Sequence, residues 1–194
     1  AQGGGGLDLL VGAETEAGVR WPDLTHARGE LGELFSGLPA VDGAAVLAQG
    51  RESAGLPPPQ AVAAAVGALK RTADLVVVDS GREAPAVEAE QVLLMVGADV
   101  RSVASARMLA ESRAVTPTGL VVRQGPGRGI PADVVARSLG VPCVGIIGHA
   151  KALPRLAELG MVPVGGPARR YRRQVAAIRR VHSPWLGSAS ASSH

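Results

Sequence analysis

Residues 74–81, DLVVVDSG, place an acidic side chain at the end of a short run of β-branched residues. In an open α/β sheet, ligands bind where buried strands end, so the carboxylate of Asp79 is well placed to meet a metal ion or a phosphate-bound water. An aspartate before Ser-Gly is also a common turn former or helix cap. The residues alone leave both interpretations open.

A nucleotide site also needs a cradle for phosphate, and in P-loop proteins this is a glycine-rich turn that ends in Gly-Lys-Ser/Thr at a helix start. The chain has only two lysines, Lys70 and Lys151, and neither follows a glycine. The segment GPGRGIP, residues 125–131, offers Arg128 but has the wrong spacing. A phosphate loop is therefore absent from this chain, and Arg128 is expected to be a solvated loop charge.

Other arrangements of catalytic residues are equally sparse. The four histidines are too scattered for a helical metal pair, and no G-x-S-x-G motif occurs. The single cysteine, Cys143, excludes a cysteine-based zinc cluster and is expected to be a small buried hydrophobic residue. Nothing in these residues establishes catalysis.

Positive charge is concentrated near the C-terminus. Six of the 20 basic residues fall after residue 166, where no acid occurs: Arg169, Arg170, Arg172, Arg173, Arg179 and Arg180. If this segment is helical, Tyr171, Val175, Ile178 and Val181 form an apolar stripe, and most of the arginines lie opposite. Such a helix either packs its stripe on a sheet or contacts an anionic surface, which could be acidic lipid, nucleic acid or an acidic partner.

Hydrophobic periodicity predicts the elements that position these residues. Short apolar runs predict strands at residues 44–48, 75–79, 92–96, 119–123 and 143–147, and helical spacing predicts helices at 59–71, 100–113, 131–139 and 151–159. Residues 7–12 and 30–38 are expected to form two further short helices, the first capped by Asp8. Pro59 and Pro131 favour helix starts, Asp99 favours a cap, and Gly140 and Gly160 favour helix ends.

Nearly continuous apolar strands indicate burial on both faces, which a parallel sheet between helices provides. The sequence therefore predicts an α/β fold, with a mostly parallel sheet of about five or more strands and helices on both faces. We expect one domain over residues 1–181 and a flexible tail over residues 182–194. No apolar run approaches the roughly 20 residues of a spanning helix, and no signal pattern is present, so we expect a soluble, cytoplasmic protein. The first residue, Ala1, suggests a piece of a longer chain.

The order of these segments resembles the MinD/ParA group of deviant P-loop ATPases, and within it the actinobacterial CpaE-like septum-site-determining proteins. VRWPDL, DLVVVDSG, VLLMVGADVRSVASARML and the run from GLVVRQ to LGVPCVGIIG are similar to successive segments of that group. The resemblance covers residues 3–181 and implies a P-loop NTPase-like fold whose phosphate-loop strand lies upstream of Ala1. The gap left by this strand would be covered by upstream residues, by re-paired strands or by a homodimer.

The same resemblance implies a set of site residues. Asp79 takes the magnesium-facing position, and Ser80 and Arg123 take cofactor-binding positions. Asp79 is followed by Ser80, Gly81 and Arg82 where the group has Asp-x-Pro-x-Gly, and Arg123 stands where an adenine-contacting asparagine is expected. We therefore expect no cofactor in this chain alone, whereas a full-length protein could bind ATP and magnesium.

The function implied is that of a septum-site-determining, cell-division regulatory protein whose partners are cell-division or secretion proteins. The arginine-rich helix would add a peripheral contact with the inner face of the membrane, which we rank above nucleic acid. No ATPase activity is expected from this chain alone. Two alternatives stay open: an active MinD-like ATPase that positions secretion or pilus machinery with catalytic residues upstream, and a nucleic-acid-associated partition-type module.

Overall fold

The computed structural model describes residues 6–50, 57–81, 87–112, 115–127, 129–163 and 166–182. The chain divides into two compact units. Unit 1 comprises Ala1–Gly81, Pro85–Glu88 and Leu153–Pro163, and unit 2 comprises Arg82–Ala84, Ala89–Ala152 and Val164–His194. The single domain over residues 1–181 stays a prediction, and residues 183–194 of the predicted tail lie outside the described residues.

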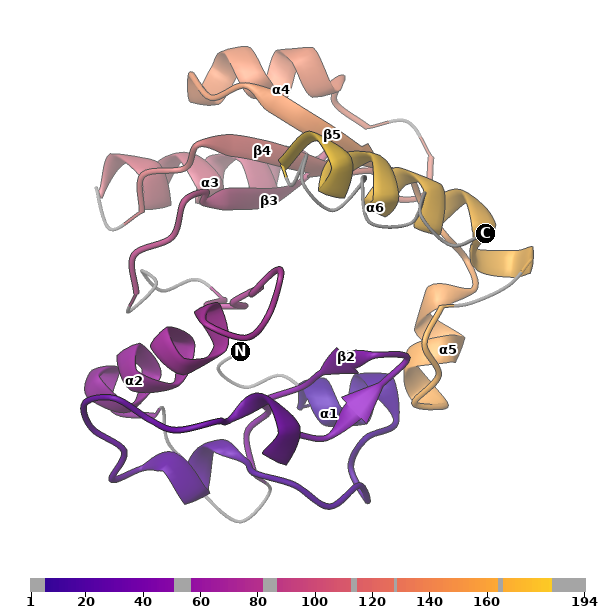
Figure 1. Ribbon diagram of the computed structural model, residues 1–194. Coiled ribbons are helices and arrows are strands. Elements are labelled where there is room, and N and C mark those ends of the chain that lie inside the picture. Colours follow the sequence, from indigo (N-terminus) through magenta and orange to yellow (C-terminus); the bar gives the residue numbers. More distant parts are fainter. Residues whose placement is uncertain are drawn as a thin grey trace, which may run out of the picture. The chain divides into compact units, whose positions relative to one another are not determined.

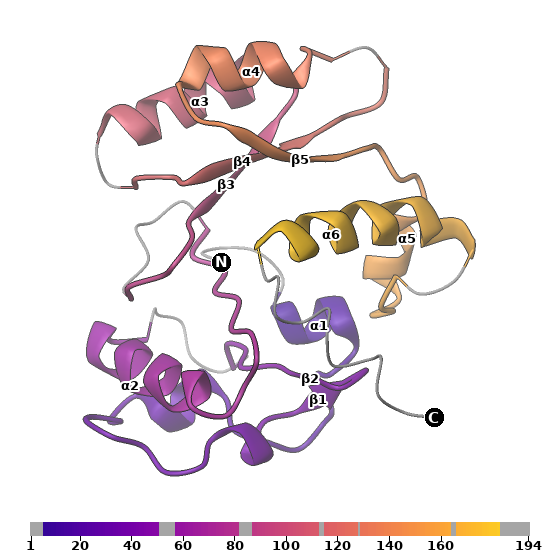
Figure 2. The ribbon, with the colours of Figure 1, turned by 45° about the horizontal axis from the view of Figure 1, so that its top comes forward.

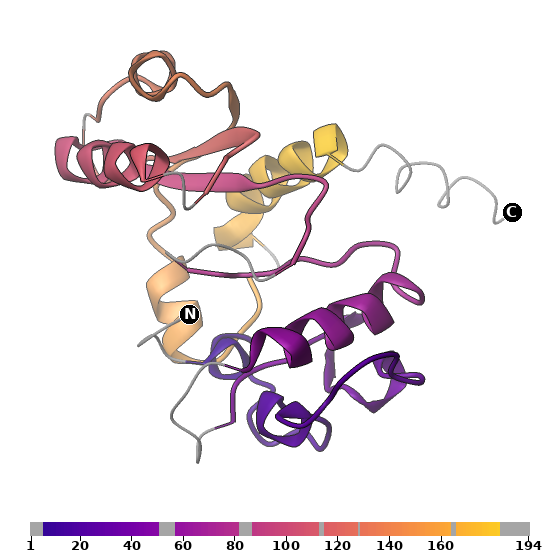
Figure 3. The same ribbon diagram turned by 90° about the vertical axis from the view of Figure 1, so that its left-hand side faces the viewer.

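Unit 2 contains a three-stranded parallel sheet with helices on both faces. Its elements are β3 (Leu93–Gly97), α3 (Val100–Glu111), β4 (Gly119–Arg123), α4 (Ala132–Leu139), β5 (Cys143–Ile147), a short 3-10 turn η3 (Gly166–Ala168) and α6 (Arg169–His182) (Figure 1). Figures 2 and 3 show α3 and α4 on one side of the sheet and α6 on the other. This arrangement confirms the predicted α/β class.

The core of unit 2 lies between the sheet and the first pair of helices. Leu94 pairs with Leu120 and Val96 pairs with Val122, so alternate residues of β3 and β4 point to the same face. Val96, Leu120 and Val122 pack there with Val135 of α4 in one buried cluster. The continuous apolar run of β4 is buried on both faces, as expected for a central parallel strand. The other face of β3 is more open, since Leu93 and Met95 are exposed there.

Helix α6 covers the opposite face over β5. A side chain added at Gly145 of β5 would collide with Ile178, so the glycine lets the helix approach the strand closely. The side-chain oxygen of Gln174 accepts a hydrogen bond from the backbone N–H of Gly148 at 3.1 Å. Ile178 and Gln174 of the arginine-rich helix therefore pack within unit 2, whereas Val175 of its predicted apolar stripe is 38% exposed.

Unit 1 is built from short elements around a smaller core. They are α1 (Leu7–Val11), the 3-10 turns η1 (Trp21–Leu24) and η2 (Phe35–Gly37), the antiparallel pair β1 (Ala40–Val41) and β2 (Ala44–Ala45), α2 (Pro59–Lys70) and α5 (Leu153–Glu158). Leu34 and Leu38 pack with Ala65 and Ala68 of α2. Asp42 and Gly43 both have positive φ, which is the geometry of a two-residue hairpin turn.

Several boundaries confirm the local signals in the sequence. Helix α2 begins at Pro59, the side chain of Asp99 caps α3, and Gly140 and Gly160 adopt left-handed φ values of 68° and 59°. Helix α4 begins at Ala132, with Pro131 as its cap, one residue later than predicted. Within the described residues, no helix is both long enough and apolar enough to cross a membrane.

Other predictions were wrong. The parallel sheet has three strands in the described residues, fewer than the five or more expected. Residues 75–79 form no strand, and Val77 is 81% exposed, because no neighbouring strand pairs with them. Within residues 44–48 only β2 forms, and it is antiparallel. Residues 30–38 contain η2 and no α-helix, and Asp8 lies buried inside α1 while Gly6 occupies the cap position.

Candidate functional site

The carboxyl ends of the three parallel strands line an open hollow of about 520 Å³ in unit 2. Gly97 and Arg123 are the last residues of β3 and β4, and His149 follows β5 by two residues. Met95, Asp99, Ser102, Gln124, Gly125 and Pro126 complete the lining. Ligands of open α/β sheets bind at this edge, so the hollow is the candidate functional site.

Arg123 gives the hollow a positive charge. Its side chain is exposed, and it forms no hydrogen bond or ion pair with any described residue. His149, on the next strand's carboxyl end, is exposed as well. A guanidinium presents several N–H donors in a planar fork that matches carboxylate and phosphate groups. The hollow can therefore attract an anionic group.

Asp99 does not neutralise this positive charge by direct contact, because Ser102 engages both of its carboxylate oxygens. The backbone N–H of Ser102 donates to one oxygen at 2.9 Å, and the Ser102 hydroxyl donates to the other at 2.7 Å. The hydroxyl hydrogen bond, followed by the backbone one, lowers the pKa of Asp99 below its ordinary value. A side chain at Gly97 would collide with this cap, so a glycine is required where β3 ends.

Removing the cap should loosen the start of α3. We expect Asp99→Ala to make the amides of the first turn of α3 exchange several-fold faster, because the Ser102 N–H loses its acceptor. Asp99→Asn is the matched control, since asparagine also caps helices. The pKa of Asp99 is lowered in the folded state. The charge-dependent part of the stability is therefore present above the ordinary pKa of an aspartate and is lost as pH falls through the folded pKa. Hydrogen exchange of the parent and Asp99→Asn should therefore converge in acid; a constant difference would contradict this origin.

The predicted magnesium residue lies elsewhere in the chain. Asp79 and Ser80 belong to unit 1, whereas Arg123 belongs to unit 2. Asp79 is exposed, and its side chain accepts a hydrogen bond from the backbone N–H of Gly81 at 3.0 Å, with Gly81 at a φ of 63°. This is the turn geometry that the sequence also allowed. The cofactor roles of Asp79, Ser80 and Arg123 stay predictions.

A magnesium site would need more ligands than Asp79 supplies. Magnesium prefers octahedral oxygen coordination and is held by carboxylates together with waters and substrate phosphates. In the part of the chain that the structure describes, no group of three or more His, Cys, Asp or Glu side chains could hold a metal ion. Asp79 would therefore need further ligands from elsewhere, and its magnesium role stays a prediction.

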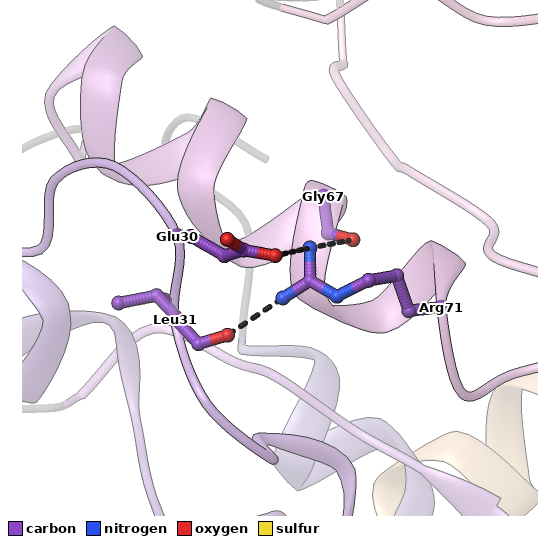
Figure 4. Close-up of polar contacts among 4 residues, drawn as sticks. All are labelled: Glu30, Leu31, Gly67 and Arg71. Atoms are coloured by element: carbon purple, nitrogen blue, oxygen red, sulfur yellow. Dashed lines mark hydrogen bonds and ion pairs between the residues drawn. The ribbon is translucent and has the colours of Figure 1, made fainter.

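A second hollow, of about 580 Å³, lies in unit 1 against α2 and residues 30–33. Arg71 bridges the two segments, as Figure 4 shows: it donates to the carbonyl oxygens of Leu31 at 2.6 Å and Gly67 at 3.1 Å and pairs with Glu30 at 3.8 Å. The ion pair is largely exposed and adds little stability. Because its guanidinium is engaged by these acceptors, Arg71 holds the loop to the helix and is a weaker candidate for binding an anion than Arg123.

The six C-terminal arginines all lie on α6 and are exposed. None of them forms a hydrogen bond or ion pair with a described residue. The predicted division of this helix is present in part: Ile178 packs on β5, and Arg172, Arg173, Arg179 and Arg180 face solvent. Val175 of the predicted apolar stripe is exposed as well. The contact of these arginines with an anionic surface stays a prediction.

Cys143 and Arg128 are the remaining residues singled out by the sequence, and Gln124 and His149 are lining residues that the sequence analysis did not name. Cys143 is half-buried at the edge of the unit 2 core, where a small hydrophobic residue was expected. Gln124 and His149 were missed as lining residues. Both follow the end of a parallel strand, and a polar residue after an apolar run is the same kind of signal that favours Asp79. Arg128 lies outside the described residues.

No protein-family model matches the chain. Two curated proteins of Mycobacterium tuberculosis are similar to it: Uncharacterized protein Rv3660c of strain H37Rv and Uncharacterized protein MT3760 of strain CDC 1551 / Oshkosh. Each is 38% identical over 188 residues, which cover 91% of this chain and 52% of the relative. The chain thus spans about half the length of the curated relatives it matches.

Among solved structures, the chain resembles one from Aquifex aeolicus described as a MinC:MinD cell division protein complex. The TM-score is 0.63 at 16% sequence identity, and the match covers 97% of this chain and 81% of that one. At this identity the likeness shows the fold alone. The chain therefore has an α/β fold similar to one in that complex.

Proposed function

We propose that the chain is the regulatory, partner-binding portion of a MinD-like cell-division protein of the CpaE-like, septum-site-determining kind. The main support is the fold, which is similar to that in a MinC:MinD cell division protein complex. A candidate binding site lies at the carboxyl edge of the sheet, where Arg123 is an unpaired cation among the described residues. Its partners would be other cell-division proteins in the cytoplasm.

The proposal assigns no hydrolysis of ATP to this chain by itself. Both lysines lie outside the hollow: the ammonium of Lys70 donates to the backbone of Glu88, and Lys151 lies beyond the last residue that lines the hollow. Phosphate recognition in P-loop proteins depends on a glycine-rich turn with such a lysine. The geometry instead supports recognition of an anionic group by Arg123 without a reaction.

A second candidate is an active ATPase in which a longer protein supplies the missing residues. Two observations favour it: the relatives are about twice as long as the matched segment, and Arg123 lies where a sheet of this class binds its ligand. In that protein, Arg123 would contact the nucleotide and Asp79 would contribute to the magnesium site.

Nucleotide titration separates these candidates. We expect this chain, titrated with ATP and magnesium in a calorimeter, to show no saturable binding below about 1 mM, which corresponds to less than about 4 kcal/mol of binding free energy. Tight binding that depends on magnesium and is weakened by both Arg123→Ala and Asp79→Asn would overturn the proposal in favour of the ATPase. Arg101→Ala, an exposed arginine of α3, is the matched control.

A further inference from the structure

Strand β3 lies at an open edge of the parallel sheet. Among the described residues it pairs with β4 on one side and with no strand on the other. The backbone groups of Val92 and Ala98, which flank the strand, bond toward β4. Successive residues of a strand direct their N–H and C=O groups to opposite sides. The backbone groups of Leu93, Met95 and Gly97 therefore point to the open edge.

The sequence of β3 does not protect this edge. Natural proteins shield edge strands with charged residues, proline or bulges. The strand LLMVG contains no charge and no proline, and its register with β4 is regular. At the other edge of the sheet, β5 pairs with β4 through a shift in register, and α6 lies over it. The side chains of Leu93 and Met95 are also 39% and 60% exposed. The edge of β3 is thus the one that favours addition of a strand.

We propose that β3 pairs antiparallel with β3 of a second copy of this chain, which joins the two sheets into one. A two-fold axis beside Met95 sets identical strands side by side in opposite directions. Met95 then faces Met95 of the second copy, and Leu93 faces Gly97. Each of these is a hydrogen-bonded pair that exchanges two bonds, so all the outward backbone groups of β3 find partners. A shift by two residues would leave one of them facing a residue beyond the strand.

The charges at the two ends of β3 favour this antiparallel direction. Glu90 precedes the strand and Arg101 follows it at the start of α3, and both side chains are exposed. In the proposed register the end of one strand lies beside the beginning of the other, so Arg101 of each copy approaches Glu90 of the other. Asp99 lies at the same end, but Ser102 engages both of its carboxylate oxygens. A parallel arrangement would bring like charges together, which is destabilising.

The side chains on the open face of β3 also suit a second copy. Leu93 of each copy lies beside Gly97 of the other, which has no side chain to collide with it. The two Met95 side chains meet at the axis, and methionine is flexible enough to fill an irregular gap. A contact between two five-residue strands is small, so we expect a weak dimer that depends on concentration.

The test is sedimentation equilibrium of the complete 194-residue chain at concentrations from about 1 μM to about 1 mM. We expect the average mass to rise from 19.6 kDa toward twice that value. The amides of residues 93, 95 and 97 should exchange more slowly at high concentration, because their N–H groups become bonded. A mass that stays at 19.6 kDa overturns the proposal and leaves the edge to a strand from another protein. A mass that rises beyond twice this value also overturns it, since two-fold pairing is closed.

Substitution of Met95 locates the contact. Met95→Lys should weaken the dimer about 10-fold or more, because two ammonium groups would meet at the axis. The matched control is Met108→Lys, the same change at a methionine of α3 that is 73% exposed. This control should dimerise within about threefold of the parent, since it lies outside the paired strands. Equal effects of the two lysine variants would place the contact elsewhere and overturn the proposal.

Charge reversal tests the direction of pairing without changing the strand itself. Arg101→Glu and Glu90→Arg should each weaken the dimer about fivefold or more, because each creates two pairs of like charges across the axis. The variant that combines both changes should recover to within about threefold of the parent, since opposite charges meet again. Circular dichroism checks that each variant keeps its helix content. If Met95→Lys unfolds, the combined variant decides, and its failure to recover overturns the proposal.

Discussion

Leu120→Ala is expected to destabilise unit 2 by about 2 to 5 kcal/mol, the range for a leucine truncated in a packed core. Leu120 is fully buried in the middle strand and packs with Val96, Val122 and Val135 between the sheet and the helices. Truncation loses the free energy gained by burying the removed side-chain carbons, and it leaves a cavity that the neighbouring strands close only in part. Amide hydrogen exchange, followed by mass spectrometry of peptides from residues 93–147, measures this loss.

The control is Leu93→Ala, the same chemical change on the neighbouring strand. Leu93 is 39% exposed and contributes to no buried cluster, so its truncation should cost about 1 kcal/mol or less. Peptides from α2 in unit 1 provide an internal reference, because unit 1 has its own core. Equal protection losses for the two variants would mean that Leu120 does not anchor the core.

The α/β part of the fold was predictable because its signals are local. Asp99 and Gly140 mark a helix start and a helix end, and the apolar runs of β3, β4 and β5 are separated by stretches of helical spacing. Repeated strand-helix-strand units then favour adjacent parallel strands, since helices cover the faces of such sheets. The class and most boundaries follow from these features.

Residues 75–79 show that local signals do not report whether a strand has a partner to pair with. Their β-branched residues favour extended backbone, and the backbone there is extended, yet Leu75, Val77 and Val78 are substantially exposed. A strand forms only where a second strand completes its hydrogen bonds, and β propensity mainly measures packing against such neighbours. Sequence alone does not say whether that neighbour is present.

The hairpin of unit 1 shows the reverse case: its turn signal is strong, but its strands are too short to give a signal of their own. Asp42-Gly43 is a strong two-residue turn signal, but the strands it joins are only two residues long.

The candidate site was predictable in location, at the strand ends, and less so in detail. Asp99 and Arg123 lie in one hollow, yet only the structure shows that Ser102 engages the carboxylate, while the guanidinium has no partner among the described residues.

The second large effect is expected at Gly12, which ends α1. Its φ is 71°, a left-handed conformation that disfavours any side chain, and an added Cβ would overlap the carbonyl oxygen of Gly160. Gly160 is itself left-handed, and its own Cβ would lie 3.1 Å from the Cα of Gly12. The two glycines therefore let α1 and the segment after α5 approach through their backbones.

Gly12→Ala should destabilise unit 1 by more than about 2 kcal/mol, because roughly 1 kcal/mol of left-handed strain adds to an overlap that only backbone movement relieves. Gly43→Ala separates the two causes, since Gly43 has a φ of 78° but nothing within 4 Å of an added Cβ. That variant should lose about 1 kcal/mol from strain alone. Hydrogen exchange of peptides covering residues 7–12 and 153–163 measures the difference. If Gly12→Ala and Gly43→Ala show equal protection in these peptides, the contact between Gly12 and Gly160 does not hold α1 against the segment after α5.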